Sequence, residues 1–118
     1  MKLQGLHHVS PVCSDIERTD AFYHDVLGMP LLRKTVDDGA PTMPRWYWST
    51  GTGSVAGYPG SFITYFSLPK NVPPIYGHIG KGVTHHFAFE VESDEAQQYW
   101  RERLLEHGLK VTPVLDRK

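Results

Sequence analysis

One stretch of the sequence occurs twice, and this internal repeat constrains the fold more than any other feature. The first copy begins at Leu6 and reads LHHVSPVCSDIERTDAFYHDVLG, and the second begins at Thr84 and reads THHFAFEVESDEAQQYWRERLLEHG. Each copy has a pair of histidines, a strand-like run, Ser-Asp, a helix-like run with two adjacent aromatic residues, and a closing glycine. A repeat of this kind predicts two copies of one supersecondary unit.

The first copy, residues 6–68, predicts a β-α-β-β-β order of elements. Apolar spacing and turn-forming residues place a strand at 6–13, a helix at 16–27 and strands at 31–36, 45–49 and 62–68. Ser14 and Glu17 have the spacing of a capping box before the helix. Gly28 and Pro30 are expected to end that helix.

The second copy is shorter than the first. Residues 69–82 are rich in glycine and proline and are expected to connect the two copies. Residues 83–118 then predict a strand at 83–91, a helix that begins near Ser93 and stops at Gly108, and a strand at 109–115. The second copy therefore lacks the length of two strands and a turn, and we expect one domain over 1–118 with an incomplete second half.

Composition excludes several classes of protein. The chain has 118 residues and a net charge of −1, whereas nucleic-acid-binding domains usually carry a strong positive excess. No apolar run is long enough to predict a membrane span. Cys13 is the only cysteine, which fits a reducing compartment and favours a cytoplasmic protein.

The two histidine pairs are the best candidates for chemistry. Side chains alternate across a strand, so His86 shares a small, polar face with Thr84 and Ala88, whereas His85 shares the apolar face with Phe87. Neutral imidazoles on neighbouring strands can ligate one metal ion, and the repeat makes His8 equivalent to His86. The residues alone leave a structural role for these histidines open.

Three segments resemble a known family. They are LHHVSPVCSD, in which His8 lies seven residues before Asp15, then FYHDVLGMPLL, and later GVTHHFAFEV. This combination resembles the glyoxalase/bleomycin-resistance/extradiol-dioxygenase superfamily, also called vicinal oxygen chelate proteins. Within it, the chain looks most like the glyoxalase-family ring-cleaving dioxygenases.

The resemblance implies an α+β fold of paired βαβββ modules that form an open cup around a divalent metal. On this basis the second module is truncated after its helix and one strand. The implied metal ligands are His8, His86 and a glutamate on the last strand of the second module, which is absent before Lys118. Such a set favours Fe(II) or Mn(II), with Zn or Ni possible.

The implied function is that of a dioxygenase-like protein acting on a small aromatic diol or similar vicinal-oxygen substrate, seen here as a fragment. Trp46, Trp48 and Tyr65 are candidates to line the substrate pocket, and His85 is a candidate acid or base. A non-catalytic, bleomycin-resistance-like binding protein, a glyoxalase-type lyase or isomerase, and a degenerate structural copy are the alternatives. The isomerase is disfavoured because Ile63 and Thr64 stand where isomerases have Glu or Gln.

The resemblance and the short second copy also bear on assembly. Loss of two strands would expose a sheet edge and an apolar face, so the chain is expected to self-associate, and a homodimer is the expected form.

Overall fold

The computed structural model describes residues 1–51, 61–73, 75 and 80–116. The chain divides into two compact units, Met1–Pro74 and Ile75–Lys118. The boundary between them falls inside the stretch 69–82 that the sequence indicates as a connector. Each unit is described by itself. Among the described residues, no helix has the length and hydropathy needed to cross a membrane.

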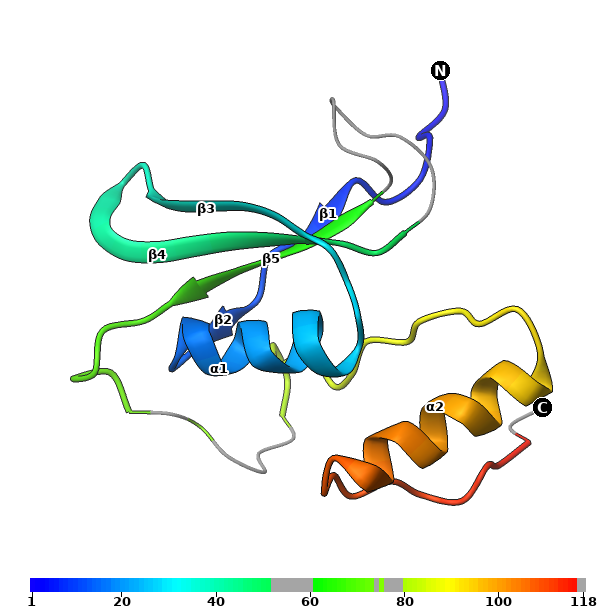
Figure 1. Ribbon diagram of the computed structural model, residues 1–118. Helices are drawn as coiled ribbons and strands as arrows, with labels where there is room; N and C mark the ends of the chain where they lie inside the picture. The colour runs from blue at the N-terminus through cyan, green and yellow to red at the C-terminus, as the bar shows by residue number, and fades with distance from the viewer. Residues whose placement is uncertain (52–60, 74, 76–79, 117–118) are drawn as a thin grey trace. The chain divides into compact units, whose positions relative to one another are not determined.

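The first unit is built on a mixed five-stranded sheet with one helix (Figure 1). The strands are β1 (His8–Val9), β2 (Val12–Cys13), β3 (Leu31–Asp37), β4 (Ala40–Ser49) and β5 (Phe62–Ser67). Their order is β1-β5-β4-β3, with β2 also paired to β5. The ladders β3–β4 and β4–β5 are antiparallel, whereas β1 and β2 run parallel to β5. The predicted β-α-β-β-β order is confirmed.

The strand predicted at 6–13 forms as two short pieces. β1 ends at Val9 and β2 begins at Val12, so the interruption falls at Ser10 and Pro11. Proline has no backbone N–H to donate to a ladder, which is why it breaks or bulges a strand. The Pro11 carbonyl still accepts from the backbone N–H of Phe66 at 3.2 Å, so both pieces stay on the same edge of β5.

The helix between β2 and β3 starts as α1 (Ile16–Asp20) and continues as the wider π-helical segment η1 (Ala21–Val26). Its N-cap is Asp15, whose carboxylate accepts from the backbone N–H of Arg18 at 3.0 Å. The capping box predicted at Ser14 was therefore wrong by one residue. Gly28 follows the helix with φ of 69°, the left-handed conformation that a closing glycine adopts readily.

The core of the first unit lies between the helix and one face of the sheet. Its buried members come from both layers and are Ile16, Tyr23, Met29, Trp46, Trp48 and Ile63. Trp48 is fully buried, and its indole N–H donates to the Asp20 carboxylate at 2.7 Å. This bond satisfies the one polar atom of the largest side chain in the core.

The second unit contains α2 (Asp94–Glu106). Its N-cap is Ser93, whose hydroxyl accepts from the backbone N–H of Ala96 at 3.1 Å, and Gly108 follows with φ of 76°. The helix start and stop predicted from the sequence are confirmed.

The strands predicted at 83–91 and 109–115 are not formed, and these predictions were wrong. A strand needs a neighbour to receive its backbone hydrogen bonds. In the first unit β5, the last strand of the module, gives that pairing to β1 and β2. The described part of the second unit has no strand, so residues 83–91 lie irregular and exposed.

The exposed stretch 83–91 carries an apolar set at alternate positions, with exposed fractions of 39 % at Phe87 and 46 % at Phe89. If the chain self-associates through this stretch, Phe87→Lys together with Phe89→Lys should lower the association measured by light scattering after size exclusion. Tyr99→Lys, at an exposed aromatic on α2, is the matched control and should not. A parent chain that is monomeric at all concentrations would contradict the prediction.

Candidate functional site

The sheet of the first unit has two faces with different contents. Trp46, Trp48, Ile63 and Tyr65 point towards the helix and join the core. Because side chains alternate along a strand, their neighbours point the other way. We call this opposite surface the His8 face and define it by His8, Arg45, Tyr47, Phe62, Thr64 and Phe66.

Aromatic rings on the His8 face form a continuous strip. The imidazole of His8 is stacked on Phe62, with ring centroids 4.8 Å apart and planes 2° apart. The ring of Phe62 lies 5.5 Å from that of Tyr47. The Cζ of Arg45 is 5.3 Å from the Tyr47 ring centroid and 4.7 Å from that of Phe66. The strip therefore connects an imidazole at one end with a guanidinium at the other.

The environment of His8 favours the neutral imidazole. Partial burial lowers the pKa of His8 from its ordinary value, and the positive charges of His7 and Arg45 lower it further. Its Nδ1 lies 2.7 Å from the Nδ1 of His7. Whichever ring donates in this bond has an Nε2 without a proton, which is the form that binds a metal.

The second histidine pair repeats this local geometry. The Nδ1 atoms of His85 and His86 are also 2.7 Å apart. Ring centroids are 5.0 Å apart in both pairs, with planes at 80° in the second and 73° in the first. Both histidines of the second pair are exposed, so the sequence-based view of His85 as a core or rim residue is not met.

The described residues do not complete a metal site. No group of three His, Cys, Asp or Glu side chains stands close enough to hold an ion in the part of the chain that the structure describes. His8 belongs to the first unit and His86 to the second. Their imidazoles suit a divalent transition metal, but the donor set still lacks the carboxylate that the resemblance implies.

The aromatic residues proposed for a substrate pocket lie under the helix. Trp48 is fully buried and Trp46 is 8 % exposed. The hydroxyl of Tyr65 lies 2.8 Å from that of Tyr23, and burial raises the pKa of both phenols. These three side chains face away from His8. The aromatic residues beside His8 are Tyr47 and Phe62, and strict alternation along RWYWS, with the tryptophans assigned to the core, is the signal that points to Tyr47.

Two polar atoms of the His8 face are buried without a partner, namely the Thr64 hydroxyl and the Arg45 Nε. Arg45 has an ion pair with Asp37, but the two charged atoms are 4.0 Å apart. Charge-assisted hydrogen bonds between nitrogen and oxygen are about 2.7–2.9 Å long. The guanidinium therefore keeps donor capacity that the protein itself does not use.

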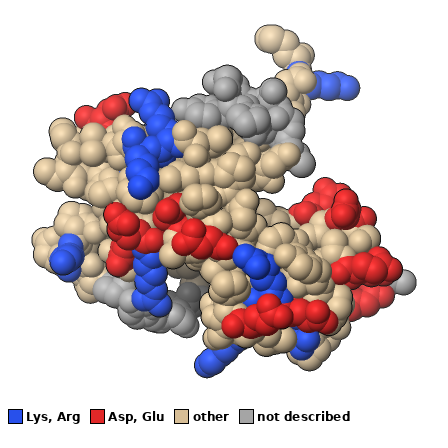
Figure 2. Space-filling model, viewed as in Figure 1, with Lys and Arg blue, Asp and Glu red and all other residues tan. Residues whose placement is uncertain are grey.

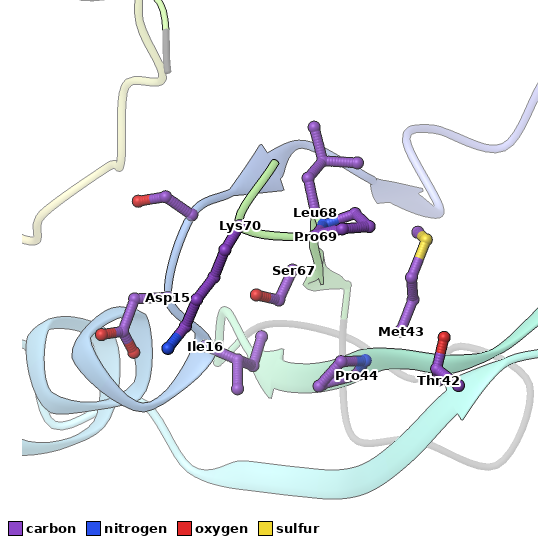
Figure 3. A pocket seen from close by; sticks show the side chains of 10 residues that line it. Asp15, Ile16, Thr42, Met43, Pro44, Ser67, Leu68, Pro69 and Lys70 are labelled. Atoms are coloured by element: carbon purple, nitrogen blue, oxygen red, sulfur yellow. The ribbon is translucent and has the colours of Figure 1, made fainter. Parts of the chain in front are cut away.

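A cavity of about 540 Å³ lies at the opposite end of β5 (Figure 3). Lys70 extends there towards the start of α1, where Asp15 lies. Ser67 lies five residues along β5 from Phe62, or about 16 Å at 3.3 Å per residue. The cavity contains none of the site residues that the sequence predicted. Its lining residues are Ser14, Asp15, Ile16, Thr42, Met43, Pro44, Ser67, Leu68, Pro69 and Lys70.

The surface charge adds no strong binding signal. Figure 2 shows positive and negative side chains mixed over the visible face rather than gathered into a field of one sign. This agrees with the net charge of −1.

Comparisons with known proteins agree with this fold. Residues 5–118 match the family model of the Glyoxalase/Bleomycin resistance protein/Dioxygenase superfamily. Two proteins of Bacillus subtilis, "Putative ring-cleaving dioxygenase MhqA" and "Putative ring-cleaving dioxygenase MhqE", are each 34 % identical to this chain, over 90 % and 94 % of its length. The chain spans only 31 % and 34 % of those relatives.

Solved structures show the same fold. A glyoxalase/bleomycin resistance protein/dioxygenase domain from Frankia has a TM-score of 0.74 at 22 % identity, covering 95 % of this chain and 75 % of that one. The fosfomycin resistance protein FosX from Listeria monocytogenes, crystallised with Mn(II) and sulfate, has a TM-score of 0.59 at 19 % identity, covering 95 % and 78 %.

The mixed sheet, the covering helix and the repeated histidine pair define a chain of the vicinal oxygen chelate fold. The chain belongs to the Glyoxalase/Bleomycin resistance protein/Dioxygenase superfamily.

Proposed function

We propose that this chain supplies part of a divalent-metal-dependent, dioxygenase-like site for a small aromatic diol or a similar substrate with vicinal oxygens. The observation that carries the proposal is the stacking of His8 on Phe62 at one end of the aromatic strip. A neutral imidazole and a row of flat apolar rings are what a metal-bound aromatic ligand requires. The ring-cleaving dioxygenase names of the relatives support the same chemistry.

In this proposal His8 and His86 are two ligands of the metal, and a carboxylate outside the described residues is the third. Fe(II) or Mn(II) is favoured for two imidazoles and one carboxylate, and Zn or Ni also fits such ligands. The metal would supply open coordination positions for two substrate oxygens and Lewis-acid polarisation of them. FosX, which shares the fold, binds Mn(II).

The residues of this chain would position the ring. Phe62 and Tyr47 offer their faces to an aromatic ligand by offset or edge contacts. His7 would orient His8 through the bond between their Nδ1 atoms. His85 would do the same for His86, which makes it a positioning residue in place of the acid or base role.

A second candidate function is ligand binding without turnover. It is favoured by the absence of a three-ligand group among residues 1–51, 61–73, 75 and 80–116. A lyase or isomerase is less favoured, because Thr64 stands where such enzymes have Glu or Gln. We further infer a cytoplasmic homodimer, which the lone Cys13 and the exposed apolar residues at 83–91 support.

Oxygen uptake separates these functions. The chain is loaded anaerobically with Fe(II), mixed with catechol or hydroquinone, and followed with an oxygen electrode and by the loss of diol absorbance. We expect uptake that requires both iron and diol and that disappears in His8→Ala. Diol binding without uptake would favour the binding protein, and no diol binding would reject the proposal.

A further inference from the structure

We propose that Arg45 recognises an anionic group on the substrate, so that the ligand of the His8 face is an aromatic diol that also carries a carboxylate. This inference rests on the proposed function for the position of the diol, and it adds the chemical class of the substituent at the other end of the ring.

The strip of rings determines where that group would lie. A flat ligand whose oxygens are beside His8 would extend over Phe62 and Tyr47. Its far end would meet the guanidinium of Arg45, which lies against the rings of Tyr47 and Phe66. The charge of Arg45 is also close enough to His8 to lower the pKa of its imidazole.

The state of Arg45 indicates an unmet need for an anion. Its side chain is 23 % exposed, its Nε is buried without an acceptor, and Asp37 is 4.0 Å from its Nη1. A guanidinium presents five donors in a planar fork that fits a carboxylate through two parallel bonds. A carboxylate ligand would therefore satisfy donors that the protein leaves unused.

Two kinds of anionic oxygen would suit this fork, namely a carboxylate substituent and a phenolate of the diol itself. The structure favours the carboxylate, because the diol oxygens are assigned to the His8 end of the strip and Arg45 is at the other. Benzoate, which has only the carboxylate, and catechol, which has only the hydroxyls, distinguish the two sources.

The test is a binding titration of the metal-free 118-residue chain, followed by tryptophan fluorescence and calorimetry. The probes are 3,4-dihydroxybenzoate, benzoate and catechol. We expect 3,4-dihydroxybenzoate to bind about tenfold more tightly than catechol, and benzoate binding to be measurable. Arg45→Met should remove that advantage, Arg45→Lys should retain part of it, and catechol affinity should stay unchanged.

Lys34→Met is the matched control, because it removes the same charge from the neighbouring strand. Lys34 lies over the ring of Trp46, at 4.1 Å from its centroid, on the opposite face of the sheet. An equal loss in Lys34→Met and Arg45→Met would show a general charge effect and overturn the inference. Equal affinity of the parent chain for catechol and 3,4-dihydroxybenzoate would do the same. If Arg45→Met fails to fold, Arg45→Gln is measured in its place.

Failure of this inference can be told from failure of the proposed function. Iron-dependent oxygen uptake with catechol, together with no preference for the carboxylate, would retain the function and reject the role of Arg45. Carboxylate binding that depends on Arg45, together with no metal binding, would retain the anion site and reject the metal-dependent function.

Discussion

Replacing His8 with alanine is expected to abolish the rise in melting temperature that Mn(II) gives the parent chain. A ligand that binds only the native state stabilises it by about 2.7 kcal/mol at a concentration one hundred times its Kd. For a domain of this size that is a rise on the order of 10 °C. Removing one of two histidine ligands should lower the affinity so far that no rise remains.

His24→Ala is the control for this experiment, because His24 is an exposed histidine on the helix of the same unit. It should retain the full metal-dependent rise. His86→Ala should behave like His8→Ala if both imidazoles bind one ion. An unchanged rise in His86→Ala would reject the shared site, and no rise in the parent chain would reject metal binding altogether.

Replacing Trp48 with alanine is expected to lower the free energy of unfolding of the first unit by about 3–5 kcal/mol. Trp48 is fully buried against the helix and β5, so its removal leaves a large cavity in the core. It also leaves the Asp20 carboxylate without the indole N–H that now donates to it. This cost is a large share of the 5–15 kcal/mol that stabilises a typical domain.

Urea unfolding followed by circular dichroism measures this loss. Tyr99→Ala, at a side chain 56 % exposed on α2, is the aromatic control and should change the free energy of unfolding little. Trp48→Phe keeps most of the ring but removes the N–H, and we expect it to cost about 1–3 kcal/mol. A Trp48→Ala variant as stable as Tyr99→Ala would contradict the assignment of Trp48 to the core.

Local patterns predicted much of the first unit. The spacing of apolar residues, the closing Gly28 and the β-branched strands gave the correct order of elements. These features act through neighbours in sequence, so they can be read without knowing the fold. The N-cap was misplaced by one residue because Ser14 and Asp15 are both good capping residues, and only the backbone geometry selects between them.

The second unit and the site depended on more distant contacts. Residues 83–91 have the composition of a strand but have no paired strand in the part of the chain described here, and pairing is what makes a strand. Trp46 and Trp48 resembled pocket residues until the sheet showed that they face the helix while Tyr47 faces His8. A shift of one residue exchanges the two faces of a strand.

By itself, the sequence determined the repeat, the equivalence of His8 and His86, and the family to which the chain belongs, because each of these is carried by the order of residues along the chain. Only the tertiary structure decided which side chains share a surface. The stacking of His8 on Phe62 and the position of Arg45 at the far end of the strip depend on the register between β1, β5 and β4. Register joins residues far apart in sequence, and the packing of the core against the helix selects it.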